Sequence, residues 1–174
     1  MPDAAPDPMA KWTPVPDWSG ARLARPGWTA APVSGLFQTL LSGDLSAAFA
    51  TLSPAPASIG LWAIAASARA AIRIGRDRAL LVATEPVALA TGWRAGGWAA
   101  SDASDAYAVI DIAGRTLREI IAEATSAEVE AGSASAAISF ADVPALLYRL
   151  AADHARVHVE ACFAPYLWRW LETR

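Results

Sequence analysis

A cluster of small polar residues, SDASD at 101–105, is one place where this sequence could do chemistry. The hydroxyl of Ser104 and the carboxylate of Asp105 could bind the amine or heterocyclic N–H groups of a ligand. The same residue types also hydrogen-bond to neighbouring backbone N–H groups and favour the turn that leads a chain into a strand. Because an alternating apolar segment begins at Tyr107, we expect a structural turn here, with ligand binding by Ser104 and Asp105 as the alternative.

The stretch DHARVHVEAC spaces His154, His158 and Cys162 four residues apart. On one helix face these side chains would resemble a zinc-binding triplet. The alternation over 156–161 instead favours a strand, in which His158 lies on the face opposite to its valine neighbours. We therefore expect no metal site, histidines partly exposed on a sheet surface, and a small buried Cys162 rather than a reactive thiol.

Composition excludes several classes of protein. The chain has 174 residues, 14 basic and 17 acidic, and no cluster of Lys and Arg dense enough for nucleic-acid binding. Its single cysteine cannot form an intramolecular disulfide. The acidic, proline-containing start lacks the pattern of a signal peptide, and the longest apolar stretch, 59–72, is too short to span a bilayer. We expect a soluble cytoplasmic protein without a membrane or nucleic-acid partner.

The first 35 residues differ from the rest in composition, because they are rich in proline and tryptophan. Seven of the 12 prolines lie here, together with Trp12, Trp18 and Trp28, so we expect residues 1–35 to form an extended arm with no helix or central strand. Three tryptophans are costly to leave in water, so the arm is expected to lie on its own domain or on another chain. Residues 36–174 are expected to form a single domain.

The remaining sequence predicts an α+β fold, with an antiparallel or mixed sheet and packed helices. Apolar spacing over 34–52 predicts two short helices, the second capped by Asp44. Short apolar segments over 59–83 predict strands, and TGWRAGGW at 91–98 predicts a turn without the order of a nucleotide-binding loop. The second half predicts these elements in turn: a strand at 107–112, a turn at Gly114, a helix at 114–125, a three-stranded meander at 136–140, 144–150 and 156–161, and a final amphipathic helix from Phe163 to Leu171.

The final helix carries two tryptophans that the helical spacing places differently. Trp170 shares a stripe with Phe163, Leu167 and Leu171, so we expect it in the core. Trp168 lies about 160° away around the helix axis and is expected to be exposed in the isolated domain. The sequence therefore predicts a partner interface that contains Trp168 with one or more of the arm tryptophans, Trp12, Trp18 and Trp28.

Three segments together resemble a known family. They are WAASDASDAYAVIDIAGRTLREIIAEAT from Trp98, SASAAISFADVPALLYRL, and ARVHVEACFAPYLWRWLE. They look like the gamma subunit of heterotetrameric sarcosine oxidase, a shortened relative of the folate-binding aminomethyltransferase domain of the glycine cleavage T protein. The resemblance covers 98–172 well, 60–90 loosely and the arm not at all. Arg115 and the Ala161-Cys162 pair depart from the family pattern.

The resemblance implies a shortened aminomethyltransferase fold and an accessory, non-catalytic role beside larger alpha and beta subunits. In that family the larger subunits carry flavin and NAD, oxidise the N-methyl group of sarcosine, and pass the one-carbon unit to tetrahydrofolate. This chain is then expected to have no catalytic residue and no cofactor of its own. The alternative is a stand-alone folate- or pterin-binding protein that uses Ser104 and Asp105.

Overall fold

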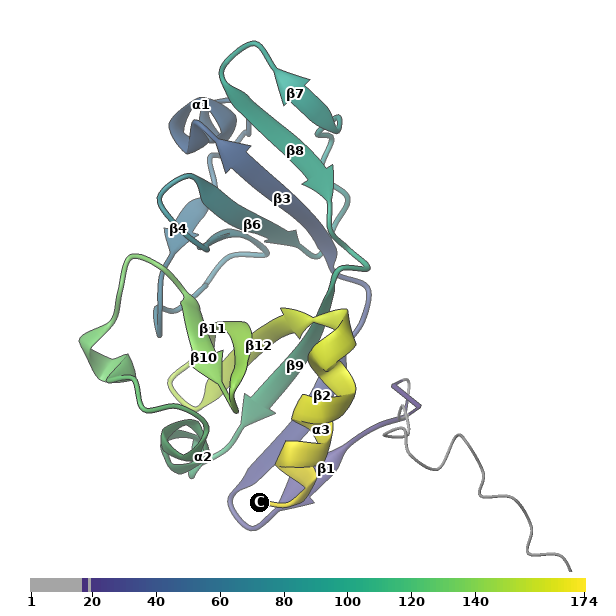
Figure 1. Cartoon of the computed structure of the whole chain (residues 1–174), viewed down its shortest axis with the longest axis vertical. Coiled ribbons are helices and arrows are strands. Elements are labelled where there is room, and N and C mark those ends of the chain that lie inside the picture. The colour runs from purple at the N-terminus through teal and green to yellow at the C-terminus, as the bar shows by residue number, and fades with distance from the viewer. Residues whose placement is uncertain (1–16, 19) are drawn as a thin grey trace, which may run out of the picture.

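The computed structural model describes residues 17–18 and 20–174, which fold into two six-stranded sheets with packed helices (Figure 1). All strand pairs are antiparallel except the parallel pair β4–β5. Sheet A contains, in spatial order, β1 (Leu23–Arg25), β2 (Trp28–Val33), β9 (Tyr107–Ala113), β12 (His154–Glu160), β11 (Val143–Ala151) and β10 (Ala137–Phe140). Sheet B contains β4 (Ala57–Ile59), β5 (Arg69–Arg73), β6 (Arg78–Ala83), β3 (Phe37–Gly43), β8 (Trp98–Asp102) and β7 (Gly92–Arg94). The predicted α+β class is confirmed.

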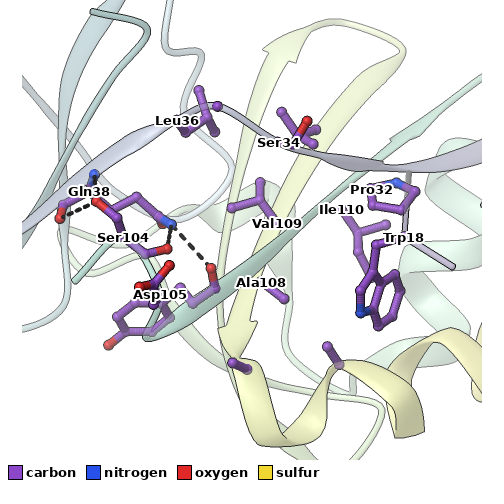
Figure 2. Close-up of a pocket in the computed structure, with 15 residues that line it drawn as sticks. Trp18, Pro32, Ser34, Leu36, Gln38, Ser104, Asp105, Ala108, Val109 and Ile110 are labelled. Carbon is purple, nitrogen blue, oxygen red and sulfur yellow. Dashed lines mark hydrogen bonds between the residues drawn. The ribbon is translucent and has the colours of Figure 1, made fainter. Parts of the chain in front are cut away.

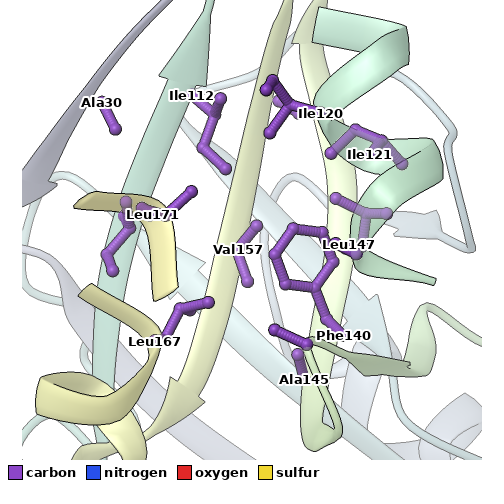
Figure 3. Packing of buried hydrophobic residues seen from close by; sticks show 14 of the residues in the cluster. Ala30, Ile112, Ile120, Ile121, Phe140, Ala145, Leu147, Val157, Leu167 and Leu171 are labelled. Carbon is purple, nitrogen blue, oxygen red and sulfur yellow. The ribbon is translucent and has the colours of Figure 1, made fainter. Parts of the chain in front are cut away.

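The helices cover the outer faces of the two sheets. They are α1 (Leu45–Ala50), α2 (Leu117–Ala124) and α3 (Ala164–Glu172), with short 3-10 turns η2 (Val129–Ala131) and η3 (Ala161–Phe163). Helices α2 and α3 pack on sheet A (Figure 3), and α1 packs on sheet B. A third apolar cluster joins β5 and β6 to β11, so the sheets also pack on each other. No helix among the described residues is long and apolar enough to cross a membrane.

Strand alternation decides which side chains enter which cluster. On β11, Ala145 and Leu147 point toward the helices, whereas Leu146 and Tyr148 point toward sheet B. Because both faces of β11 are covered, its sequence reads as a nearly continuous apolar run rather than as a clean alternation.

The second half of the chain folds as its sequence predicts. Strands β10, β11 and β12 form the expected meander, and Pro165 lies in the first turn of α3. The chain turns from β9 toward α2 at Gly114, whose φ is +138°. A Cβ atom there would lie 2.3 Å from the backbone oxygen of Gly27, so only glycine permits this close approach.

The first predicted helix in 34–52 is wrong, since this segment forms β3. Leu41 packs under α1, while Leu40 faces the other sheet, so the strand is apolar on both faces. A short apolar run of this kind cannot be distinguished from a buried helix by its spacing. The second prediction is confirmed, because Asp44 caps α1 by accepting a hydrogen bond from the Ala47 N–H at 3.0 Å.

The expectation that the arm contains no interior strand is wrong for residues 28–33. Strand β2 lies between β1 and β9, with Pro32 in register with Ile110. Strand β1 pairs with β2 only as far as Ala30. At Pro32, the edge of β2 that faces β1 therefore forms no strand-to-strand hydrogen bonds, and a proline is tolerated there. Residues 1–16 and 19, with Trp12, lie outside the described residues.

The predicted exposure of the final-helix tryptophans is also wrong. Trp168 is 4% exposed, whereas Trp170 is only half-buried. The buried stripe of α3 consists of Ala164, Leu167, Trp168 and Leu171. Phe163 does not belong to this stripe, because it is the N-cap residue that precedes the helix. Because the predicted stripe was counted from Phe163, it included Trp170 in place of Trp168.

The two described tryptophans of the arm, Trp18 and Trp28, pack on the same domain. Trp28 is 5% exposed within the core of sheet A, and the half-buried Trp18 ring meets Trp168 edge to face, with ring centroids 5.8 Å apart. Little of Trp28 or Trp168 is left for a second protein to cover. The predicted contact of Trp12, Trp18, Trp28 and Trp168 with a partner stays a prediction.

We expect Trp168→Ala to lower the free energy of unfolding by about 3–5 kcal/mol, because it removes a buried aromatic ring. Trp170→Ala should cost on the order of 1–2 kcal/mol, since that ring is already partly in water. Urea unfolding of the full chain measures both values. A larger loss for Trp170→Ala than for Trp168→Ala would contradict the packing described here.

Candidate functional site

A pocket of about 470 Å³ lies where four segments meet (Figure 2). Trp18 lies at one end, and Gln38, Ser104 and Asp105 lie at the other. The wall between the two ends is mostly apolar and is formed by Pro32, Val33, Leu36, Ala108, Val109 and Ile110, with Ala161 and Ala164 from the start of the last helix. Pockets of 300–1,000 Å³ with an apolar lining and few polar groups are typical small-molecule sites.

The polar cluster at 101–105 has a structural role at this pocket. The Ser104 N–H donates to the Asp102 carboxylate at 3.0 Å, and the Ser104 hydroxyl accepts from the Gln38 N–H at 3.2 Å. These bonds hold the turn between β8 and β9, as the sequence predicts. The hydrogen bond to Ser104 lowers the pKa of Asp102.

Asp105 differs from its neighbours in the cluster. Its side chain is exposed at the pocket and makes no hydrogen bond or ion pair with any described residue. The structure therefore brings both residues of the ligand-binding alternative, Ser104 and Asp105, to the same cavity. Only Asp105 keeps its polar atoms available.

Behind the pocket, three buried polar side chains connect the two sheets. The Gln38 side-chain oxygen lies 2.8 Å from His158 Nδ1, and His158 Nε2 lies 3.0 Å from the Tyr148 hydroxyl. Gln38 also donates from Nε2 to the backbone oxygens of Ser104 and Tyr107, at 3.3 and 3.1 Å. Gln38 comes from sheet B, and His158 and Tyr148 come from sheet A.

These contacts assign the protons of the His158 ring. Because the Gln38 amide nitrogen already donates twice, its oxygen accepts from Nδ1–H, and Nε2 accepts from the Tyr148 hydroxyl. Such a ring is neutral. Burial lowers the pKa of His158 to about 3, with a smaller contribution from the Arg156 charge, and burial raises the pKa of Tyr148 to about 12.

An ion pair continues this polar layer on sheet A. Arg156 binds both carboxylate oxygens of Asp111, with nitrogen–oxygen distances of 2.7 and 2.9 Å. Burial lowers the pKa of Arg156, but the bonds and charge of Asp111 outweigh this and leave it raised. His154 Nε2 lies 3.1 Å from a carboxylate oxygen of Asp111, at the edge of this pair.

The structure separates the three residues that we considered as zinc ligands. His158 is completely buried, which corrects the expectation of a partly exposed ring, whereas His154 is partly exposed as predicted. Cys162 is exposed on η3 near Glu160, and not buried as expected. Within 17–18 and 20–174, no three His, Cys, Asp or Glu side chains converge to hold a metal ion.

Sequence reasoning missed Gln38 and Tyr148. Gln38 lies in a strand that is covered on both faces, and in such a position a buried amide must find hydrogen-bond partners. We did not recognise Gln38 as a buried strand residue because we predicted a helix over this segment. The arrangement suits binding and inter-sheet cohesion, because its imidazole and phenol are hydrogen-bonded inside the protein and do not reach the pocket.

The buried neutral His158 predicts how stability depends on pH. Between the ordinary histidine pKa of 6.5 and the folded value of about 3, the unfolded chain binds a proton that the folded chain does not. The free energy of unfolding should therefore fall on acidification through this range, by up to about 1.4 kcal/mol per pH unit from this group. His158→Gln should make the decline shallower in urea unfolding from pH 7 to 4. His154→Gln is the matched control, and equal slopes in wild type and His158→Gln would contradict the assignment.

The chain was compared with known proteins. No model of a protein family matches it, and no curated protein matches it. Among solved structures, it is similar to a chain of the heterotetrameric sarcosine oxidase from Corynebacterium sp. U-96, determined in complex with pyrrole 2-carboxylate. The TM-score is 0.67 at 23% sequence identity, and the match covers 83% of this chain and 81% of the other. The described chain therefore has the fold of a sarcosine oxidase chain over most of its length.

Proposed function

We propose that this protein is an accessory subunit of a heterotetrameric, sarcosine oxidase-like flavoenzyme. The observation that carries the proposal is the similarity of fold to a chain of such an enzyme, which extends over 83% of this protein and 81% of the other chain. The two chains thus have nearly the same extent, as expected of equivalent subunits. The three sequence segments between 98 and 172 support the same assignment to a gamma-type subunit.

The proposed role is structural rather than catalytic. The groups best suited to acid–base chemistry, His158 and Tyr148, are buried at 0% and 1% exposure and are hydrogen-bonded to each other, so a substrate cannot reach them without opening the sheets. Flavin, NAD and tetrahydrofolate would then belong to larger alpha- and beta-type subunits. These subunits would oxidise the N-methyl group of sarcosine and transfer the one-carbon unit.

Co-purification tests this proposal. The tagged full chain, co-expressed with the neighbouring genes of its locus, should retain a flavin-containing protein through size-exclusion chromatography. A tagged unrelated protein expressed with the same genes is the control. Recovery of the chain alone, with no flavin absorbance in its fractions, would contradict the proposal.

A second candidate is a stand-alone folate- or pterin-binding protein. The observation in its favour is that Ser104 and Asp105 line one pocket of suitable size, with the Asp105 carboxylate free to accept from a pterin N–H. The apolar wall could then pack against the ring system.

Calorimetry separates the two candidates. If the chain is a folate-binding protein, tetrahydrofolate should bind the isolated chain in a one-to-one complex, and Asp105→Ala should abolish the measured heat of binding. A Kd of about 1 mM, which corresponds to a binding free energy of about −4 kcal/mol, would give a measurable heat at about 1 mM ligand. Absence of any heat of binding at that concentration would remove this candidate.

A further inference from the structure

We propose that the pocket between Trp18 and Asp105 binds a small organic cation, an amine or ammonium compound with an apolar or aromatic body. The site goes beyond the accessory role proposed above and does not depend on it. The positive group of the ligand would pair with the Asp105 carboxylate, and its body would lie along the apolar wall toward the Trp18 indole.

The first support is the charge around the polar end of the pocket. Asp105 is exposed and has no cationic partner among the described residues, so its charge is available to a ligand. Glu160 lies opposite Tyr107 in the register of β12 and β9 and adds a second negative charge nearby. Burial raises the pKa of the Tyr107 hydroxyl, and the charge of Glu160 raises it further, while Arg78 acts in the opposite sense. Among the residues that the structure describes, the lining contains no basic side chain.

The second support is the distribution of polar and apolar groups along the cavity. In Figure 2, Trp18 and Asp105 lie at opposite ends, with Ala108 and Val109 between them. At the Asp105 end, Gln38 and Ser104 are already engaged, since they hydrogen-bond to each other. Asp105 is the one charged side chain among the described residues of the lining. A ligand that fits this layout has one charged group and a contiguous apolar part. An indole at the far end favours an aromatic or alkylammonium body.

The same charges disfavour other occupants. Folates carry carboxylates on their glutamate tail, and these would be repelled by the Asp105 carboxylate in the lining. A protein segment is less well suited than a small molecule, because the cavity is bounded by four chain segments rather than spread as a flat patch, whereas a stable protein interface needs about 800 Å² on each partner.

Nuclear magnetic resonance on the ¹⁵N-labelled full chain tests the proposal with phenethylammonium chloride as the probe. The Trp18 indole N–H and the Asp105 amide should shift together, with a Kd in the range of about 0.1–5 mM. The neutral isostere 2-phenylethanol should bind about tenfold more weakly or not at all, because it cannot pair with the carboxylate.

Two substitutions complete the test. Asp105→Asn should weaken binding of phenethylammonium by about tenfold. The matched control is Asp142→Asn, which makes the same charge change in the turn between β10 and β11, where a φ of +65° also accommodates asparagine. This control should leave binding unchanged.

Three results would overturn the inference. The first is equal affinity for phenethylammonium and 2-phenylethanol, which would mean an apolar site without charge selection. The second is the absence of shifts at Trp18 and Asp105 up to about 20 mM probe. The third is tighter binding of tetrahydrofolate, or of a blocked arginine-containing peptide, than of the small amine. All of these measurements use the isolated chain, so failure of the co-purification experiment would not affect them.

Discussion

A buried hydrogen-bonded link of three side chains joins the two sheets, and the geometry of the pocket depends on it. Gln38 of sheet B and His158 of sheet A are 2% and 0% exposed, and a buried amide and imidazole are tolerated only when their polar atoms have partners. Here each finds one in the other, and Tyr148 and two backbone oxygens satisfy the remaining groups. The hydrophobic effect is non-directional, whereas these hydrogen bonds are directional and favour one arrangement of the sheets.

The same link shapes the pocket. By donating to the backbone oxygens of Ser104 and Tyr107, the Gln38 amide holds the two residues that flank Asp105 and Ala106. The position of the exposed carboxylate is thus determined by a group that is itself shielded from water. The buried Gln38 hydrogen bonds therefore keep the ligand site at this edge of the molecule rigid.

The sequence predicted the second half of the chain well, for a physical reason. Strands β10, β11 and β12 pair in the order in which they follow along the chain, so local alternation, together with Gly114 and Pro165, carries most of the information for this half. Prediction failed where long-range pairing overrode local pattern. Strand β3 is covered on both faces, and β2 pairs with the distant strand β9 despite its proline. Neither the double coverage nor the distant partner shows in a short window of sequence. For the site, Ser104 and Asp105 were found from residue type, but Trp18 and Gln38 join them only through tertiary folding.

The order of strands along the chain has a consequence for biosynthesis. All strands of sheet B lie between residues 37 and 102, whereas sheet A joins residues 23–33 to residues 107–160. During translation, the inner segment can therefore assemble as soon as it leaves the ribosome. Strand β2 must wait until β9 emerges, about 80 residues later, and this long loop closure is intrinsically slow. Until then the edge of β2 that will pair with β9 is unpaired, and an unpaired strand edge favours aggregation of the nascent chain.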